Sequence, residues 1–232
     1  MNLILGLDLE TNSVDALTCD VAEVGAVLWD TDTGTPIQLL SEIISGVNVP
    51  PEVAELTGIT NDIINLVGQK GEYVWNSLWQ MLSHTKVVVA HNGIRFDYPI
   101  MKRYLAKYYS VELLNDYVYV DTMIDVPYKN ASSMRLNHLA ADQGIMNPYA
   151  HRAVFDVLTM LELLSRHNIP DIITAANSPV VTVQAMVNYD NREKARSHGF
   201  RWDADNRMWI KVMRETQMAK EDTSEFSIRK VG

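Results

Sequence analysis

The stretch LILGLDLET, Leu3 to Thr11, decides the fold of this chain and the place of its chemistry. Its apolar residues are typical of a buried strand, but Asp8 and Glu10 interrupt them. Buried carboxylates are costly unless an opposite charge or a metal ion compensates them. Because side chains two residues apart on a strand point to the same face, Asp8 and Glu10 should project together. We expect this pair either to face a cation or to mark a strand end that meets solvent.

Length and composition place the chain among ordinary globular proteins. With 232 residues, of which 47% are hydrophobic, it can bury a large core. Cys19 is the only cysteine, which excludes an intramolecular disulfide and a cysteine-rich zinc site and fits a reducing compartment. No stretch has the length of a membrane span, and the first residues lack a signal peptide's basic start and long apolar core. We therefore expect a cytoplasmic protein without membrane contact.

The charge is distributed unevenly along the chain. The formal net charge is −9, which argues against a broad basic surface for nucleic acid. The last segment, residues 186–232, carries ten Lys or Arg and eight Asp or Glu, whereas the rest carries ten and twenty-one. Clustered carboxylates that hold metal ions present a less negative site once loaded. An acidic main body therefore remains compatible with an enzyme that acts on nucleic acid.

Three strands are followed by strands that alternate with helices. Residues 3–11, 22–30 and 36–44 predict an antiparallel meander, and KVVVAH (86–91) and 117–123 predict two further strands. Apolar periodicity predicts helices at 72–84, 96–109, 134–143 and 153–167. The order predicts an α/β fold with a mixed sheet flanked by helices.

Two later segments add acids at positions that could form a site. Asp97 follows the strand KVVVAH near the start of a helix, and HRAVFDVLTMLELL carries His151 and Asp156. Five helical steps turn about 140°, so we expect His151 on the entering loop and Asp156 pointing inward. Singly, each has an ordinary explanation: a helix acid favoured by the dipole for Asp97 and a surface histidine for His151.

Together these motifs form a recognisable set. D-x-E on the first strand, F-D after a later strand and H-x-A-x-x-D opening a late helix resemble the DEDDh family of 3′–5′ exonucleases, the superfamily of polymerase proofreading subunits with a ribonuclease-H-like fold. EVGAV (23–27), ELTGIT (55–60), AHNGIRFD (90–97), VDT (120–122) and LNHLA (136–140) are landmarks in the same order. The resemblance covers residues 2–167 and departs at Asn12, where T-G is common, and at Val157, where a small residue is common.

The resemblance implies a two-metal site. Its four carboxylates belong to Asp8, Glu10, Asp97 and Asp156, an all-oxygen set suited to two Mg²⁺ ions, for which Mn²⁺ should substitute. Asp8 would bridge the ions, one ion would activate water and the other would stabilise the departing 3′-oxygen. His151 would be the general base. The product would be a nucleoside 5′-monophosphate released from a 3′ end.

The resemblance also implies a pocket for the terminal nucleotide. Its candidate residues are Leu9, Thr11, Leu56, Gly58 and Ile59, with His91 and Asn92 as further candidates. For Leu56 and Ile59 simple core packing is an equal alternative. The expected substrate is DNA, as single strands or 3′ ends. The alternatives are RNA 3′ trimming and a non-catalytic module that binds nucleic acid or a polymerase. Besides nucleic acid, a polymerase or replication protein is the candidate partner.

A proline-containing stretch, NIPDIITAANSP (168–179), predicts a domain boundary. We expect an exonuclease domain over residues 1–175 and a small α+β module over residues 180–232. The module should contain a short helix ended by Gly199 and a hairpin in which Trp202 and Trp209 flank a polar turn. It is similar to a module of obscure function on phage and mobile-element proteins that handle DNA, which implies a phage origin and a host cytoplasm.

Two roles are open for the module. Phe200, Trp202 or Trp209 could stack on bases while Arg201, Arg207 and Lys211 contact phosphates. Alternatively, the two tryptophans form the core of a very small domain, and the basic residues are its solvated face.

Overall fold

The computed structural model describes residues 2–128, 131, 133–218, 221 and 225–231. The chain divides into two compact units, Met1–Ile173 and Thr174–Gly232, which we describe separately. No helix within the described residues is long and apolar enough to cross a membrane.

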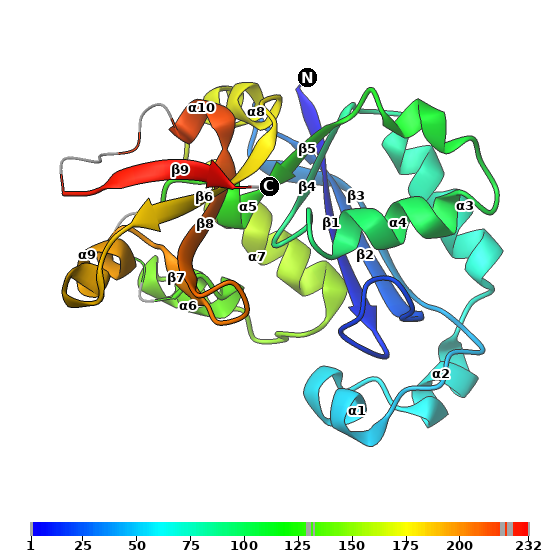
Figure 1. Cartoon of the computed structure of the whole chain (residues 1–232). Helices are drawn as coiled ribbons and strands as arrows, with labels where there is room; N and C mark the ends of the chain where they lie inside the picture. Colours follow the sequence, from blue (N-terminus) through cyan, green and yellow to red (C-terminus); the bar gives the residue numbers. More distant parts are fainter. Residues whose placement is uncertain (1, 129–130, 132, 219–220, 222–224, 232) are drawn as a thin grey trace. The chain divides into compact units, whose positions relative to one another are not determined.

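Unit 1 is built on a mixed five-stranded sheet (Figure 1). β1 (Leu3–Thr11), β2 (Val21–Asp30) and β3 (Thr35–Ile43) form the antiparallel meander, and β4 (Val87–Ala90) and β5 (Val118–Asp121) continue the sheet in parallel with β1. The strand order is β3-β2-β1-β4-β5, so β1, which carries Asp8 and Glu10, is central. The α/β class and the mixed sheet predicted from the sequence are confirmed.

Helices connect the strands and cover the sheet. They are α1 (Pro51–Thr57), α2 (Asn61–Val67), α3 (Gly71–Leu82), α4 (Asp97–Leu105), the 3-10 helix η1 (Val111–Leu114), α5 (Thr122–Asp125), α6 (Leu136–Asp142), α7 (Ala153–Ser165) and α8 (Ile169–Ala176). The strand predicted to reach residue 123 ends at Asp121, because the Asp121 carboxylate accepts a hydrogen bond from Met123 N–H and begins α5.

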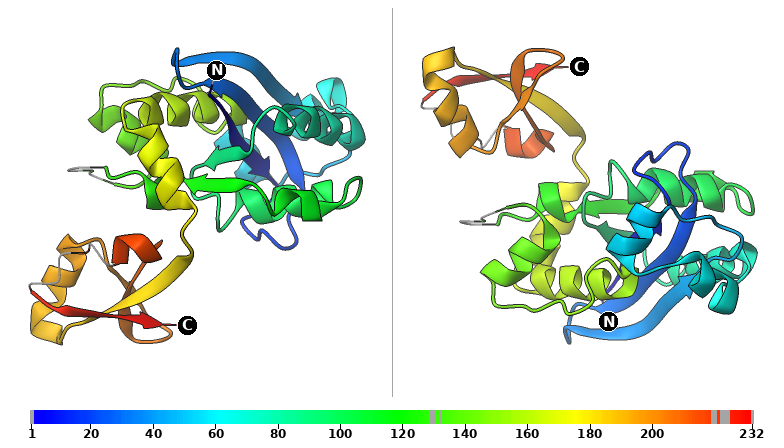
Figure 2. Two further views of the ribbon diagram at one scale, coloured as in Figure 1. Left: turned by 90° about the horizontal axis from the view of Figure 1, so that it is seen from above. Right: turned by 90° about the horizontal axis from the view of Figure 1, so that it is seen from below.

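The two faces of the sheet are covered by different helices (Figure 2). Leu5, Leu7 and Leu9 of β1 belong to a buried cluster that also contains apolar residues of α3 and α4. The opposite face contacts α7, which packs on β1 and β2. Since Asp8 and Glu10 alternate with these leucines, they project toward the face that α7 covers.

Gly25 of β2 lets α7 lie directly on the sheet. It is paired with Asp8 in the β1–β2 register. A Cβ atom on Gly25 would lie 2.4 Å from both the carbonyl carbon of Ala153 and the backbone nitrogen of Val154. Because these are main-chain atoms at the start of α7, no side-chain rotation could relieve the clash. The missing side chain therefore sets the distance between the central strands and the helix that carries Asp156.

The segment predicted to hold the domain boundary, residues 168–179, contains α8, and the division between the two units falls inside this helix. Pro170 is tolerated because it is the second helical residue, where its missing N–H costs no helical bond. Ile169, Ile172 and Ala176 are buried at helical spacing. The prolines therefore lie near the division between the units, while the spacing of the apolar residues produces a helix there.

Unit 2 contains a four-stranded antiparallel sheet with the order β7-β8-β6-β9. Its elements are β6 (Val180–Met186), the 3-10 helix η2 (Tyr189–Asn191), α9 (Arg192–Ser197), β7 (Arg201–Asp203), β8 (Met208–Arg214), α10 (Glu215–Met218) and β9 (Ser227–Val231). The short helix before Gly199 and the hairpin are present, while the strands on either side of them were not predicted. The core consists of small and apolar residues, among them Val183, Ala195, Phe200 and Phe226.

We predict that Gly25→Ala destabilises the protein because the new methyl group must displace the backbone of α7. Overpacking of this kind costs about 1–3 kcal/mol, and each kcal/mol should lower Tm by about 2–4 °C. Thermal unfolding followed by circular dichroism measures the effect. The matched control is Gly71→Ala at the start of α3, where the nearest atom to an added Cβ lies 3.7 Å away. Equal stability of the two variants would contradict the prediction.

Candidate active site

A cleft of about 710 Å³ in unit 1 brings together the residues singled out in the sequence. Asp8 and Glu10 come from β1, Asp97 is the first residue of α4, Asp156 lies in the first turn of α7, and His151 precedes that helix. All five line the cleft. Three segments that are far apart in the sequence therefore contribute to one concave surface.

Asp97 is fixed to the central strand. Its Oδ1 atom accepts a hydrogen bond of 3.1 Å from the backbone N–H of Leu9, which lies between the two acids of β1. Asp97 is buried and begins α4, where the helix dipole favours a negative charge. The bond thus ties the start of α4 to the part of β1 that carries Asp8 and Glu10.

Asp156 organises the loop before α7. Its Oδ1 accepts a hydrogen bond of 2.6 Å from Asn147 Nδ2, and its Oδ2 accepts one of 2.8 Å from the backbone N–H of His151. His151 has a φ of +63°, a conformation rarely adopted by side-chain-bearing residues and held here by this bond. One ligand atom each of Glu10, His151 and Asp156 lie within 4.8 Å of one another.

Glu23 of β2 is a fifth acid whose role the sequence analysis missed. It is fully buried beside Glu10 in the β1–β2 register. Its carboxylate accepts hydrogen bonds from Arg152 Nη2 at 2.8 Å and from the backbone N–H of Ala153 at 3.0 Å. Glu23 therefore holds the start of α7 and takes up the nearby guanidinium charge. The sequence feature that could have indicated this role is an acid within the otherwise apolar start of the strand VAEVGAVLWD.

Asp121, at the end of β5, shapes the loop that leads to Asp97. Its carboxylate oxygens accept hydrogen bonds from the backbone N–H groups of Asn92 at 2.9 Å and Ile94 at 3.1 Å. Because Asp121 is buried, these bonds replace its hydration and fix the path of the loop. Sequence reasoning noted the VDT stretch as a landmark but gave this carboxylate no role.

His91 joins two walls of the cleft. Its Nδ1 lies 2.8 Å from Thr122 Oγ1, and its Nε2 lies 2.8 Å from the backbone carbonyl of Met134. Residues 133–138, which include Met134, line the cleft. Within this segment Asn137 Oδ1 is buried and has no hydrogen-bond partner among the described residues.

The nucleotide-pocket candidates are divided between the cleft and its surroundings. Leu9, Leu56, His91 and Asn92 line the cleft, and Leu56 is 58% exposed. Thr11, Gly58 and Ile59 do not line it. Thr11 donates its hydroxyl hydrogen bond to Ser13 O, and Gly58 ends α1 with a φ of +72°. Ile59 is buried with Val49 and Ile64 in a separate apolar cluster, which is the packing alternative.

The carboxylates share an environment that disfavours four negative charges. Burial, together with Asp156 and Glu23, raises the pKa of Glu10 to about 7. Burial also raises the pKa of Asp97 to about 8, although hydrogen bonds oppose the shift. The pKa of Asp8 is raised well above its usual value by burial and by the neighbouring Asp97, Glu10 and Asp156. Carboxylates in this state fit hard divalent cations, which would supply the missing positive charge.

A mixed sheet with a central strand bearing two acids, and helices that add two more beside a histidine, defines a ribonuclease-H-like nuclease fold. Residues 5–164 match the exonuclease family RNase_T, so the chain belongs to that family. The resemblance to DEDD-type 3′–5′ exonucleases is thereby confirmed. Residues 181–229 match a domain family of unknown function, DUF8626.

Curated relatives include the PolC-type DNA polymerase III of Pediococcus pentosaceus, 26% identical over 150 residues, and that of Clostridium perfringens, 29% identical over 166 residues. The matches cover 64% and 68% of this chain but 10% of each polymerase. Solved structures of E. coli exonuclease I share the fold. One, a zinc-bound complex with single-stranded DNA, has a TM-score of 0.65 and 18% identity, with 81% of this chain and 48% of that chain covered.

A second exonuclease I structure, with a dA16 oligonucleotide, has a TM-score of 0.61 and 17% identity and covers the same shares. This chain therefore spans about half the length of exonuclease I and a tenth of the polymerases. These comparisons give no support to the expected phage origin.

We predict that the metal-free protein loses stability as the pH rises from 6 to 8. Glu10 and Asp97 titrate near 7 and 8 when folded but near 4 when unfolded, so the folded state binds more protons in this range and stability falls with pH. Thermal unfolding in EDTA should show a falling Tm, and Mn²⁺ should remove the fall.

Glu10→Gln is the control for this titration. It removes one of the two groups, so its Tm in EDTA should fall less steeply than that of the wild type. A Tm in EDTA that is flat or rises with pH in the wild type, or an equal slope in the variant, would show that these carboxylates do not share the environment described.

Proposed function

We propose that this protein is a metal-dependent 3′–5′ exonuclease that removes nucleotides from the 3′ ends of DNA, single strands in particular, and releases nucleoside 5′-monophosphates. The observation that carries the proposal is the convergence of Asp8, Glu10, Asp97, Asp156 and His151 on one cleft. A non-catalytic binding module is a weaker alternative, because acids facing a phosphate backbone reduce affinity unless they hold cations.

The four carboxylates would hold two Mg²⁺ ions, and Mn²⁺ should substitute for them. Bound divalent cations supply Lewis acidity and make water a nucleophile at neutral pH. The chain contributes the arrangement of the ligands. Asp97 is held by Leu9 N–H and Asp156 by Asn147, whereas Glu23 and Arg152 neutralise one another. Arg152 lowers the pKa of Glu10 only in part, because burial and the neighbouring acids still raise that pKa to about 7, so divalent cations would supply further positive charge.

His151 would take the proton of the attacking water. Its side chain is exposed and lines the cleft, while its backbone N–H is bonded to Asp156. This bond orients the loop without using the imidazole, and no other described residue is hydrogen-bonded to either ring nitrogen. Imidazole is well matched to that role near neutral pH.

The proposed substrate class rests on the relatives and on the cleft wall. The relatives are named as DNA polymerases, and exonuclease I is described in complex with single-stranded DNA. In this chain the exposed Leu56 could wedge against a terminal base, and His91 is hydrogen-bonded to the Met134 carbonyl of a second segment that lines the cleft. The polymerase relatives also motivate the proposal of a polymerase or replication partner in the cytoplasm. RNA trimming remains the second candidate for the same site.

We predict that Asp8→Asn and Asp156→Asn each remove nearly all nuclease activity while the fold is retained, because each deletes a metal ligand. The assay follows 5′-labelled DNA and RNA oligonucleotides of one sequence with Mg²⁺, in which a 3′–5′ exonuclease produces a descending ladder. Asp62→Asn, an exposed acid on α2, is the control and should be fully active. A folded Asp8→Asn protein with the wild-type rate would refute the metal assignment, and faster cleavage of RNA would favour the second candidate.

We predict that His151→Ala lowers the rate by roughly 10²–10⁴-fold, the range typical of a lost general base, while Mn²⁺ binding is retained. Titration calorimetry with Mn²⁺ and the ladder assay should be run on the same preparation. Because the imidazole lies within 4.8 Å of ligand atoms of Glu10 and Asp156, a large loss of Mn²⁺ affinity would identify His151 as a ligand instead.

A further inference from the structure

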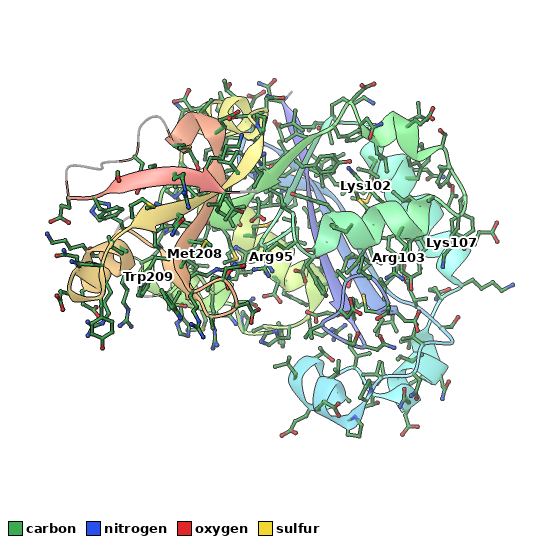
Figure 3. The ribbon with its side chains drawn as sticks, viewed as in Figure 1. Arg95, Lys102, Arg103, Lys107, Met208 and Trp209 are labelled. Carbon is green, nitrogen blue, oxygen red and sulfur yellow. The ribbon has the colours of Figure 1, made fainter. Side chains whose placement is uncertain are left out.

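Unit 2 differs in charge from unit 1. It contains ten Lys or Arg and eight Asp or Glu, whereas the residues before it contain ten and twenty-one. The most basic helix of unit 1, α4, holds its cations against aromatic rings (Figure 3). Lys102 lies 4.3 Å from the ring centre of Tyr119, and Arg103 lies 4.9 Å from that of Tyr104. Lys107, which follows the helix, lies 4.2 Å from the same Tyr104 ring centre. We therefore examine unit 2 for Lys and Arg side chains that could contact the phosphates of a nucleic acid.

Most cations of unit 2 are already occupied. Lys211 is paired with Glu221, Lys230 with Glu215 and Arg196 with Glu193, Arg229 donates to Gln184, Arg192 lies over Tyr189, and Arg214 is buried. Among the described residues of unit 2, the side chains of Lys194, Arg201 and Arg207 make no ion pair or hydrogen bond. Arg201 and Arg207 both belong to the β7–β8 hairpin and are exposed.

The hairpin also presents an aromatic surface. Trp202 on β7 is 52% exposed and lies opposite Trp209 on β8. Their ring centres are 5.8 Å apart at 60°, so the edge of one ring supports the other. Trp209 follows Met208 in β8, and these consecutive residues, labelled in Figure 3, project to opposite faces of the sheet. Trp209 packs against the core of unit 2, but Trp202 is not part of it.

The Asp203 side chain closes the turn of the hairpin through hydrogen bonds. The Asp203 carboxylate accepts hydrogen bonds from the backbone N–H groups of Asp205 at 3.0 Å and Asn206 at 3.1 Å. A side-chain hydrogen bond from Asn206 Nδ2 and these backbone bonds lower the pKa of Asp203, and the positive charge of Arg201 contributes to the same shift. Arg207 leaves the turn with a φ of +52°. Since β7 is an edge strand, Arg201 and Trp202 reach the open edge of the sheet from its two faces.

We propose that this hairpin surface, defined by Arg201, Trp202, Arg207 and Trp209, binds single-stranded nucleic acid. Trp202 stacks on a base, and the two arginines contact phosphates on either side of it. Bases have π faces whatever their sequence, so the contact holds a strand without reading it. Phe200 and Lys211, the other sequence candidates, are excluded because Phe200 is buried and Lys211 is paired. The proposal goes beyond the proposed nuclease activity and depends on it only for the choice of ligand.

Binding is tested on the full chain with a 5′-fluorescent oligothymidylate of about 30 nucleotides, longer than one single-strand site. EDTA prevents cleavage, and fluorescence anisotropy is recorded across a salt series. Trp202→Ala should weaken binding by about fivefold or more, the loss expected for one stacked base, while Trp202→Phe retains most of the affinity. Arg201→Ala combined with Arg207→Ala should reduce the log–log salt slope by about 0.7 for each lost phosphate contact.

The control for the loss of a positive charge elsewhere in unit 2 is Lys230→Ala on β9, the opposite edge of the sheet, which should leave the slope unchanged. The rate of hydrolysis of the p-nitrophenyl ester of thymidine 5′-monophosphate with Mn²⁺ measures the activity of the cleft on a substrate that has no strand to reach the hairpin. Every hairpin variant should hydrolyse this ester at the wild-type rate.

If affinity and slope are the same in wild type, Trp202→Ala and the double arginine variant, the hairpin does not bind nucleic acid. If the wild type binds the oligothymidylate but hydrolyses neither this ester nor the oligonucleotides of the ladder assay, the nuclease proposal fails. The comparison of binding between wild type and hairpin variants then still decides the hairpin proposal.

Discussion

The packing of four carboxylates at one end of the central strands is the constraint on which the rest of unit 1 depends. Burial and neighbouring acids raise the pKa values of Asp8, Glu10, Asp97 and Asp156. Ionising these carboxylates without a metal ion therefore destabilises the folded state. Such an arrangement survives only if the surrounding scaffold is stable enough to hold it. The apolar strands and the two helical layers provide that stability.

The scaffold treats its buried acids in two different ways. Glu23 and Asp121 receive donors from the protein itself, a guanidinium and backbone N–H groups, and in return they fix the start of α7 and the loop before α4. Those two segments carry Asp156 and Asp97. Glu23 and Asp121 thus position the segments around Asp156 and Asp97, two of the carboxylates proposed to hold metal ions.

The two units divide the electrostatic work. Unit 1 concentrates negative charge where metal ions would neutralise it, and its α4 cations lie over tyrosine rings. Unit 2 is smaller and slightly positive and leaves two arginines and an exposed tryptophan on one hairpin. Weak contacts on two units of one chain reinforce each other when both engage the same strand, without any single high-affinity surface.

The sequence by itself determined the fold class, the D-x-E pair and the motifs around Asp97, His151 and Asp156, because period-two alternation and local motif spacing are properties of adjacent residues. It did not determine the roles of Glu23 and Asp121, since their partners, Arg152 and the Asn92 loop, are distant in the chain. It also could not decide between pocket and core for Leu56 and Ile59, which are three residues apart. Only tertiary packing decided that Leu56 is exposed at the cleft while Ile59 is buried elsewhere, because burial depends on what lies across from a side chain rather than beside it in sequence.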